Sequence, residues 1–237
     1  MEFEKTGVPG LDEILGGGLR KGTSLLVKGQ PGTGKTILAI QFIIEGAKKG
    51  QNCVFITAEE ELEDLREYAT SLGLDLEKYE KQKLITLVKQ PVTLRKLVSI
   101  ATPLQLIAKN KVQRVVLDSL TIFKYSTEDE LSYRKEILNL IDEMKNVSFL
   151  AIAEENHRGI ENLDSKGEDY LFDGIIRMLK IRRENYFERC IFVEKLRGQK
   201  HSIDIYPCTI TENGLQVHPK EIPFSLVSNE TKGLTKE

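Results

Sequence analysis

The feature that most constrains this chain is the eight-residue run GQPGTGKT, from Gly29 to Thr36. The apolar run SLLVK precedes it, and ILAIQFIIEGAKK follows it in a helical pattern. The spacing fits G-x-x-x-x-G-K-[ST], in which glycines allow backbone conformations that side chains would block. Successive N–H groups can then point inward at an anion, and the N-terminus of the following helix favours the same charge. A strand, this turn and a helix in that order predict a phosphate-binding loop.

Two side chains of the loop have distinct expected roles. Lys35 would reach the β- and γ-phosphates of a nucleotide, and the Thr36 hydroxyl would bind Mg²⁺. The expected nucleotide contacts are Gly29, Pro31, Gly32, Thr33, Gly34, Lys35, Thr36 and Ile37. The alternative is a glycine turn with a chance lysine, which the strand-loop-helix context disfavours.

Apolar runs and helical patterns alternate between residues 24 and 153, after a turn-rich lead-in that contains the short amphipathic piece LDEIL. The predicted strands are 24–28, 53–58, 84–88, 114–118 and 148–153, and the predicted helices are 35–48, 61–72, 93–109 and 131–145. Continuous apolar strands separated by helices are typical of a parallel sheet covered on both faces.

The pattern changes after Asp173. Apolar and charged residues alternate without intervening helices in GIIRMLKIRR, NYFERCIFVEKLRG and HSIDIYPCTIT. These runs predict antiparallel strands that extend the sheet. We expect the polar stretch 154–170 to be a mobile loop, and residues 224–237 to be a flexible tail. The sequence therefore predicts an α/β fold with one domain over residues 1–223.

Composition narrows the functional classes. The formal net charge of -2 gives no overall basic field that would attract nucleic acid. Cys53, Cys190 and Cys208 lie far apart and form no metal-binding spacing, and an odd number without a secretory signal favours reduced thiols in the cytoplasm. No apolar run approaches the length of a membrane span. We expect a cytoplasmic protein without a membrane role.

Carboxylates follow two of the predicted strands. Asp118 ends RVVLD, at the sheet edge where ligands bind in parallel sheets, and could hold Mg²⁺ through its water shell. The alternative is a helix-capping aspartate. Glu59 and Glu60 follow CVFITA, and one of them could orient or deprotonate an attacking water. The alternative for this pair is an acidic first turn of the next helix, and the spacing leaves both interpretations open.

A basic segment, EKLRG, lies at the end of the second antiparallel run. Its Lys195 and Arg197 are candidates for charge stabilisation, because an arginine on a hairpin tip can act as a finger in a neighbouring subunit. The alternative is an ordinary solvated turn.

Six segments in this order resemble the KaiC-like branch of the RecA-type ATPases, over roughly residues 6–217. They are TGVPGLDEILGGGLRKG (Thr6–Gly22), GQPGTGKT, VFITAEE (Val54–Glu60), VVLDSLT (Val115–Thr121), DGII (Asp173–Ile176) and KLRGQKH (Lys195–His201). The phosphate-binding loop is shared by many families, whereas the first segment, the glutamate pair and the last segment are more specific.

The resemblance implies a RecA-like core that assembles as a homo-oligomeric ring, commonly a hexamer, with ATP and Mg²⁺ between subunits. It implies that Glu59 and Glu60 act on the attacking water. It further implies that Lys195 and Arg197 reach the γ-phosphate of the next subunit, and that His201 lies near the same nucleotide. The expected activity is hydrolysis of ATP to ADP and phosphate, driving conformational change or partner regulation. Alternatives are a nucleotide-gated binding module with negligible turnover and a DNA-stimulated, recombinase-like ATPase.

The chain also departs from its relatives in this branch. The circadian-clock KaiC proteins carry two such domains in tandem, and this chain has one. The adjacent Ser-Thr pair that the clock protein phosphorylates has no counterpart, so autokinase activity is not carried over. The stretch EENHRGIENLDSKGEDY is net acidic and a poor partner for nucleic-acid phosphates. We do not expect a nucleic-acid partner, and the sequence identifies no protein partner.

Overall fold

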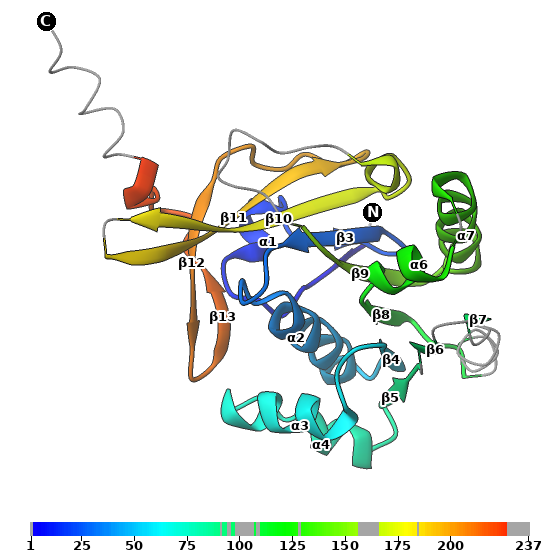
Figure 1. The fold of residues 1–237 in the computed structure, drawn as a ribbon. Helices are drawn as coiled ribbons and strands as arrows, with labels where there is room; N and C mark the ends of the chain where they lie inside the picture. The colour runs from blue at the N-terminus through cyan, green and yellow to red at the C-terminus, as the bar shows by residue number, and fades with distance from the viewer. Residues whose placement is uncertain are drawn as a thin grey trace, which may run out of the picture.

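A mixed nine-stranded sheet forms the centre of the protein in a computed structural model (Figure 1). The structure describes residues 2–90, 92–93, 96–97, 107, 110–127, 129–155, 166–183 and 185–226. The strand order is β13-β12-β11-β10-β3-β9-β8-β4-β5. The strands are β3 (Ser24–Gly29), β4 (Cys53–Thr57), β5 (Ile85–Lys89), β8 (Arg114–Asp118), β9 (Ser148–Glu154), β10 (Gly174–Arg183), β11 (Tyr186–Leu196), β12 (Tyr206–Thr211) and β13 (Gly214–Val217).

The predicted division of the sheet into parallel and antiparallel parts is confirmed, with one difference. Strands β11, β12 and β13 pair antiparallel, as expected. Strand β10, however, lies parallel to β3 and antiparallel to β11. Residues 155–173 separate β9 from β10, and a connection of that length can return the chain to the start of the neighbouring strand. Strand β10 therefore continues the parallel part of the sheet.

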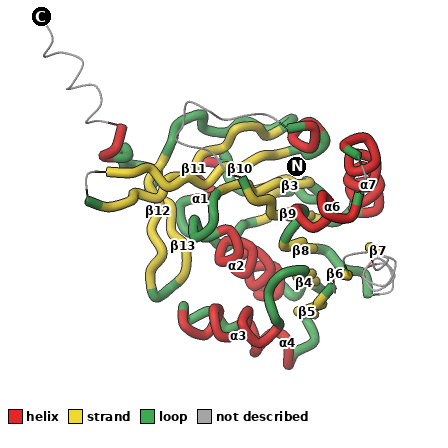
Figure 2. The backbone as a smooth tube through the Cα atoms, viewed as in Figure 1, coloured by secondary structure: helices red, strands yellow, loops and turns green. Residues whose placement is uncertain are grey.

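Helices cover both faces of the sheet (Figure 2). One face is covered by α2 (Lys35–Lys48), α3 (Leu62–Ser71) and α4 (Leu76–Lys81), and the other by α6 (Thr121–Ser126) and α7 (Glu130–Glu143). Successive strand residues point to opposite faces, so Leu25 and Val27 pack into the first core and Leu26 into the second. Helices α4 and α6 were not predicted, because they are only six residues long and carry little periodic signal.

The remaining elements are short. Strand β1 (Phe3–Glu4) pairs with β2 (Leu19–Arg20), α1 (Leu11–Ile14) lies between them, and η1 (Gly167–Tyr170) is a 3₁₀ turn before β10. The helix predicted over 93–109 is wrong at its start, because β6 (Val92–Thr93) pairs antiparallel with β7 (Lys96–Leu97). Branching at Cβ disfavours a helix at Val92 and Thr93.

Some sequence predictions fall outside the described residues. They concern most of the predicted helix at 93–109, residues 156–165 of the predicted loop, and residues 227–237 of the predicted tail. The first residues of that tail are described: the backbone N–H groups of Phe224 and Ser225 donate to the Glu188 carboxylate at 3.1 and 2.8 Å.

Candidate active site

The predicted phosphate-binding loop connects β3 to α2 at the carboxyl end of the parallel strands. Gly32 and Gly34 have φ angles of 73° and 106°, a region that side chains rarely adopt. The Lys35 Nζ donates to the carbonyl oxygens of Gly29 and Gln30 at 2.9 and 3.1 Å, so the ammonium lies over the loop. Burial lowers the pKa of Lys35, while nearby carboxylates, of which Glu154 has the largest effect, oppose that shift.

Asp118 meets the loop at Thr36. The Thr36 hydroxyl donates to Asp118 Oδ2 at 2.8 Å, and the aspartate is 7% exposed. Burial raises the pKa of Asp118 to about 6, the bond from Thr36 opposes this, and the nearby Glu59 charge adds to it. The residue before α6 is Leu120, so Asp118 does not cap that helix.

This pair has the chemistry of a partial magnesium site. Hydroxyl and carboxylate oxygens are hard ligands, and Mg²⁺ commonly takes one or two protein oxygens and completes its shell with phosphates and water. Within the described residues, no group of three or more His, Cys, Asp or Glu could hold a metal ion. Thr36 and Asp118 therefore fit a metal that arrives with a nucleotide.

The glutamate pair lies beside this group. Helix α3 begins at Leu62, and its first turn carries Glu63 and Asp64, so Glu59 and Glu60 precede the helix. Ser119 Oγ donates to Glu59 Oε1 at 2.6 Å, which ties Glu59 to the residue after Asp118.

The backbone of the glutamate pair is fixed from both sides. The Glu60 N–H donates to Thr57 Oγ1 at 3.0 Å. From β5, Lys89 Nζ donates to the Glu59 and Glu60 carbonyl oxygens at 3.1 and 2.8 Å. The loop, Asp118 and the glutamate pair thus gather at the carboxyl ends of the parallel strands.

A cavity of about 410 Å³ opens beside the loop. Besides loop residues and Ile37, its lining includes five residues that the sequence analysis missed, namely Tyr68, Ser71, Leu72, Arg189 and Ile210. Arg189 Nε donates to the Gly32 carbonyl oxygen at 3.2 Å. Glu154 was also missed, although it ends an apolar strand in the same way as Asp118. The strand-end rule could have found Glu154, whereas the cavity residues converge only through tertiary packing.

The remaining predicted residues do not join this group. Leu196 pairs with Gly174, which pairs with Leu25 near the start of β3, whereas the loop follows Gly29. Four residues of strand correspond to about 13 Å, so Lys195 and Arg197 lie toward the amino ends of the parallel strands, away from the loop at their carboxyl ends.

Own-chain carbonyl oxygens bind these basic side chains. Lys195 Nζ donates to Asp169 O and Arg197 Nη2 to Tyr170 O, each at 2.8 Å. Burial lowers the pKa of Lys195, and the neighbouring Arg197 charge adds to this effect. His201 Nδ1 lies 2.8 Å from Ser202 O.

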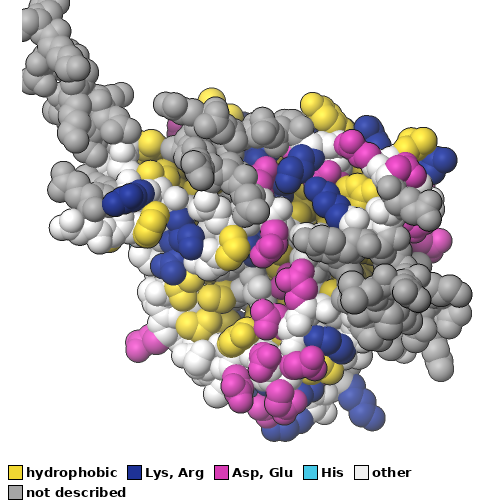
Figure 3. Space-filling model, viewed as in Figure 1, with side chains coloured by type: hydrophobic (Ala, Val, Ile, Leu, Met, Phe, Trp, Pro, Cys, Tyr) yellow, Lys and Arg dark blue, Asp and Glu magenta, His cyan; other side chains and the backbone are white. Residues whose placement is uncertain are grey.

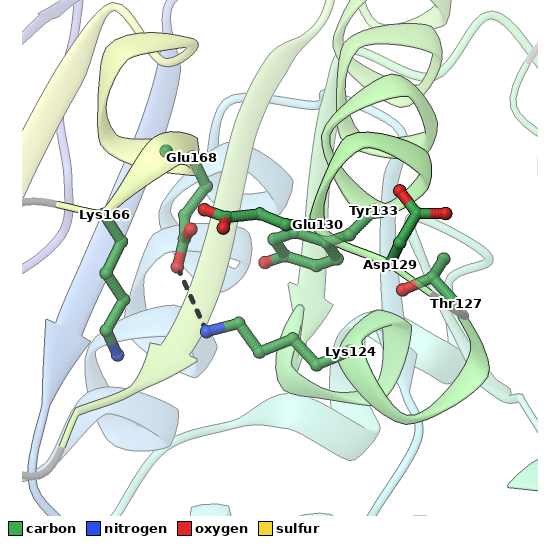
Figure 4. A pocket seen from close by; sticks show the side chains of 8 residues that line it. Lys124, Thr127, Asp129, Glu130, Tyr133, Lys166 and Glu168 are labelled. Atoms are coloured by element: carbon green, nitrogen blue, oxygen red, sulfur yellow. Dashed lines mark ion pairs between the residues drawn. The ribbon is translucent and has the colours of Figure 1, made fainter.

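A larger cavity, of about 560 Å³, lies away from the loop between α6, α7 and η1 (Figure 4). Lys124 crosses it to Glu168 at 3.7 Å and lies over the Tyr133 ring. Its lining mixes both charge signs and contains none of the predicted site residues, so size alone does not locate the chemistry. In Figure 3, acidic side chains gather over the region of α3, whose first turn carries Glu63 and Asp64.

The fold and site together define a class. A glycine-rich loop after a central strand and a carboxylate at the end of a nearby parallel strand, in a mostly parallel sheet, constitute a RecA-like P-loop core. Residues 4–222 match the family described as "ATPase: KaiC", and the chain belongs to this family. Membership supports ATP binding.

Individual relatives agree with this assignment. A KaiC-like protein of Pyrococcus horikoshii has a crystal structure that matches with a TM-score of 0.79 and 31% identity, covering 92% of this chain and 99% of that one. A UPF0273 protein of Methanopyrus kandleri is 29% identical, covering 94% of each chain. The circadian clock protein KaiC3 of Synechocystis is 29% identical over 98% of this chain and 48% of its own length. In the described part of the chain, no helix has the length and apolar character to span a membrane.

Proposed function

We propose that this protein hydrolyses ATP at sites shared between neighbouring subunits of a homo-oligomeric ring, commonly a hexamer in the KaiC-like branch. One observation carries the proposal. The loop, Asp118 and the glutamates gather at the carboxyl ends of the parallel strands, while Lys195 and Arg197 lie toward the amino ends of the same strands. A subunit then offers one half of a site to each of two neighbours. The energy would drive conformational change or regulate a partner.

In this proposal the loop-bearing subunit binds the nucleotide. The Lys35 ammonium exchanges the carbonyl oxygens of Gly29 and Gln30 for β- and γ-phosphate oxygens. Thr36 and Asp118 would hold Mg²⁺, which neutralises charge on these phosphates when bound. Glu59, placed by Ser119 beside Asp118, orients the attacking water or accepts its proton, and Glu60 supports this role. The cavity beside the loop accommodates the base and sugar, with Arg189 near the phosphates.

The neighbouring subunit supplies the second half. Lys195 and Arg197 stabilise the charge that develops on the γ-phosphoryl group, and His201 lies near the same nucleotide. These side chains cannot reach the loop of their own chain, because the length of β3 separates them. A lone subunit would therefore bind ATP and hydrolyse it slowly.

Mixing two inactive variants tests the shared site. Lys35→Ala lacks the phosphate-binding lysine but keeps the basic segment, and Arg197→Ala has the reverse defect. Each variant alone is expected to lose most turnover, and a mixture after subunit exchange should regain part of it, measured as phosphate release. Lys81→Ala, an exposed lysine of α4 that pairs with Glu77, is the control for loss of a surface charge. A mixture that stays inactive despite demonstrated exchange would remove the proposal.

A second candidate is a nucleotide-gated binding module with negligible turnover. It is favoured by the contacts of the two key side chains, since Ser119 already occupies the Glu59 carboxylate and loop carbonyls bind Lys35. If ATP leaves these contacts in place, the water is never activated. Sustained phosphate release over many turnovers by the purified protein would exclude this candidate.

A further inference from the structure

A buried network of charged side chains lies beneath the loop, on the face of the sheet that α6 and α7 cover. Lys28 and Arg177 are both 0% exposed, on paired positions of β3 and β10. Lys28 Nζ lies 2.6 Å from Asp169 Oδ1 and 3.4 Å from Glu155 Oε1. Arg177 lies 2.6 Å from Glu155 Oε2 and 3.5 Å from Asp169 Oδ2, and it also pairs with Glu194.

Stability alone is a weak explanation for this network. Removing charges from water is costly, and well-packed apolar residues of similar volume often serve as well or better. A buried ion pair does, however, fix the relative position of the segments that carry it. Here the segments are the end of β3, the end of β9, η1, and the strands β10 and β11 that carry Arg177 and Glu194.

One end of the network touches the phosphate-binding loop. Lys28 directly precedes Gly29, and the Glu155 N–H donates to the Gly29 carbonyl oxygen at 3.2 Å. That carbonyl oxygen also accepts from Lys35 at 2.9 Å.

The other end holds the basic segment through η1. Asp169 uses its carboxylate to bind Lys28 and its own carbonyl oxygen to bind Lys195. The next carbonyl oxygen, of Tyr170, binds Arg197. The Lys166 N–H donates to Asp169 Oδ2 at 3.0 Å, which closes the turn on the same carboxylate. The carbonyl oxygens of one short turn therefore bind both basic side chains of the proposed finger, Lys195 and Arg197. The buried Asp169 carboxylate fixes that turn to Lys28 of β3.

We propose that Asp169 is a positioning residue for catalysis in the neighbouring subunit: by holding η1 on Lys28, it sets where Lys195 and Arg197 stand. This inference rests on the proposed function, because it assigns Asp169 to the half-site that serves the next chain. Asp169 itself touches no nucleotide. Its effect on hydrolysis should appear only in the subunit that supplies the basic segment.

Mixed rings of the two inactive variants separate these roles. Asp169→Asn is added either to Lys35→Ala, which can act only as finger donor, or to Arg197→Ala, which can act only through its loop. In the donor, the change is expected to lower the restored kcat by about 10- to 100-fold, the effect of misplacing a catalytic group by about an ångström. The KM for ATP should hold, because the loop of the other subunit binds the nucleotide. In the loop subunit, the change should alter turnover far less, because Glu155, which donates to the Gly29 carbonyl oxygen, keeps its pairing with Arg177.

Two further variants protect this test. Glu194→Gln in the donor removes a charged partner of Arg177 but leaves the Asp169 contacts, and is expected to lower the restored turnover far less than Asp169→Asn does. If Asp169→Asn does not fold, the double variant Lys28→Met and Asp169→Leu replaces both charges and leaves Arg177 paired with Glu155. It should show the same donor-only loss of kcat.

Each outcome has a distinct meaning. A loss confined to the donor supports the proposal. Equal losses in both positions, or a loss confined to the loop subunit, would overturn it and assign the network to support of its own loop. Failure of the parent pair, before Asp169 is changed, would remove the shared site and this inference with it.

Discussion

At the residue scale, Asp118 shows the conflict between binding and stability. It is buried beside a second carboxylate, and its pKa of about 6 lies above the ordinary value of 3.8. Above pH 6 the folded protein must hold an ionised group that water no longer solvates, whereas the unfolded chain ionises it freely. The cost to the folded state is absent below about pH 4, grows between the two pKa values and is complete above pH 6.

Asp118→Asn is therefore expected to stabilise the nucleotide-free protein at pH 8 by about 1–3 kcal/mol, because the amide can still accept a hydrogen bond from Thr36 without a buried charge. The gain should disappear at pH 4, where the folded protein already holds the acid protonated. Urea unfolding at the two pH values measures the difference. Asp142→Asn, on the exposed part of α7, controls for loss of a surface carboxylate. An equal gain at both pH values would contradict the burial explanation.

At the element scale, α2 is fixed against the sheet by a glycine that a propensity argument would replace. Gly46 lies in the last turn of the helix, where alanine would ordinarily be favoured by up to about 1 kcal/mol. A Cβ here would lie 2.6 Å from Arg114 Cδ and 2.8 Å from Cys53 Sγ. Arg114 cannot easily yield, since it is 1% exposed and donates to the carbonyl oxygens of Lys5 and Phe42 at 2.8 and 2.9 Å.

Gly46→Ala is accordingly expected to lower the free energy of unfolding by about 1–3 kcal/mol, because overpacking outweighs helix propensity. Denaturant unfolding measures the sign. Gly50→Ala serves as the matched control: no atom lies within 4 Å of its new methyl group, so only the cost of its positive φ should appear, about 1–2 kcal/mol. A stabilised Gly46→Ala variant would show that Arg114 moves aside.

At the scale of the whole molecule, the proposed site is divided between the two ends of the parallel strands. ATP hydrolysis would therefore depend on assembly of the subunits. We expect ATP turnover per chain to rise with protein concentration and to level off where the ring is complete, because a lone subunit lacks the second half-site. Turnover is measured beside particle mass across the same concentrations, and Arg197→Ala is the control that should assemble without regaining turnover. Constant turnover per chain where the protein is monomeric would show that one chain holds a complete site.

The parallel strands before β10 and the helices α2, α3 and α7 were predictable, because burial of one or both faces leaves a periodic pattern in the sequence. The loop and its strand and helix could be predicted, and the strand-end rule placed Asp118 and Glu59 at the same edge. The sequence could not distinguish a capping aspartate from one that faces Thr36, or an acidic first turn from a loop before α3. Both distinctions depend on where α6 and α3 begin. The contacts at the N-terminus of each helix decide this.

Other features depended on contacts between distant segments. Three features join residues far apart in the chain. They are the parallel pairing of β10 with β3, the hydrogen bond from Arg189 to Gly32, and the hydrogen bonds from Lys195 and Arg197 to carbonyl oxygens of η1. Periodicity cannot report them, because it records which face of an element is buried and not what covers that face. The sequence by itself determined the phosphate-binding loop and the class of fold around it. Only the tertiary structure decided that the two sets of proposed catalytic residues lie at opposite ends of the parallel strands, since strand pairing alone fixes the distance between the two sets.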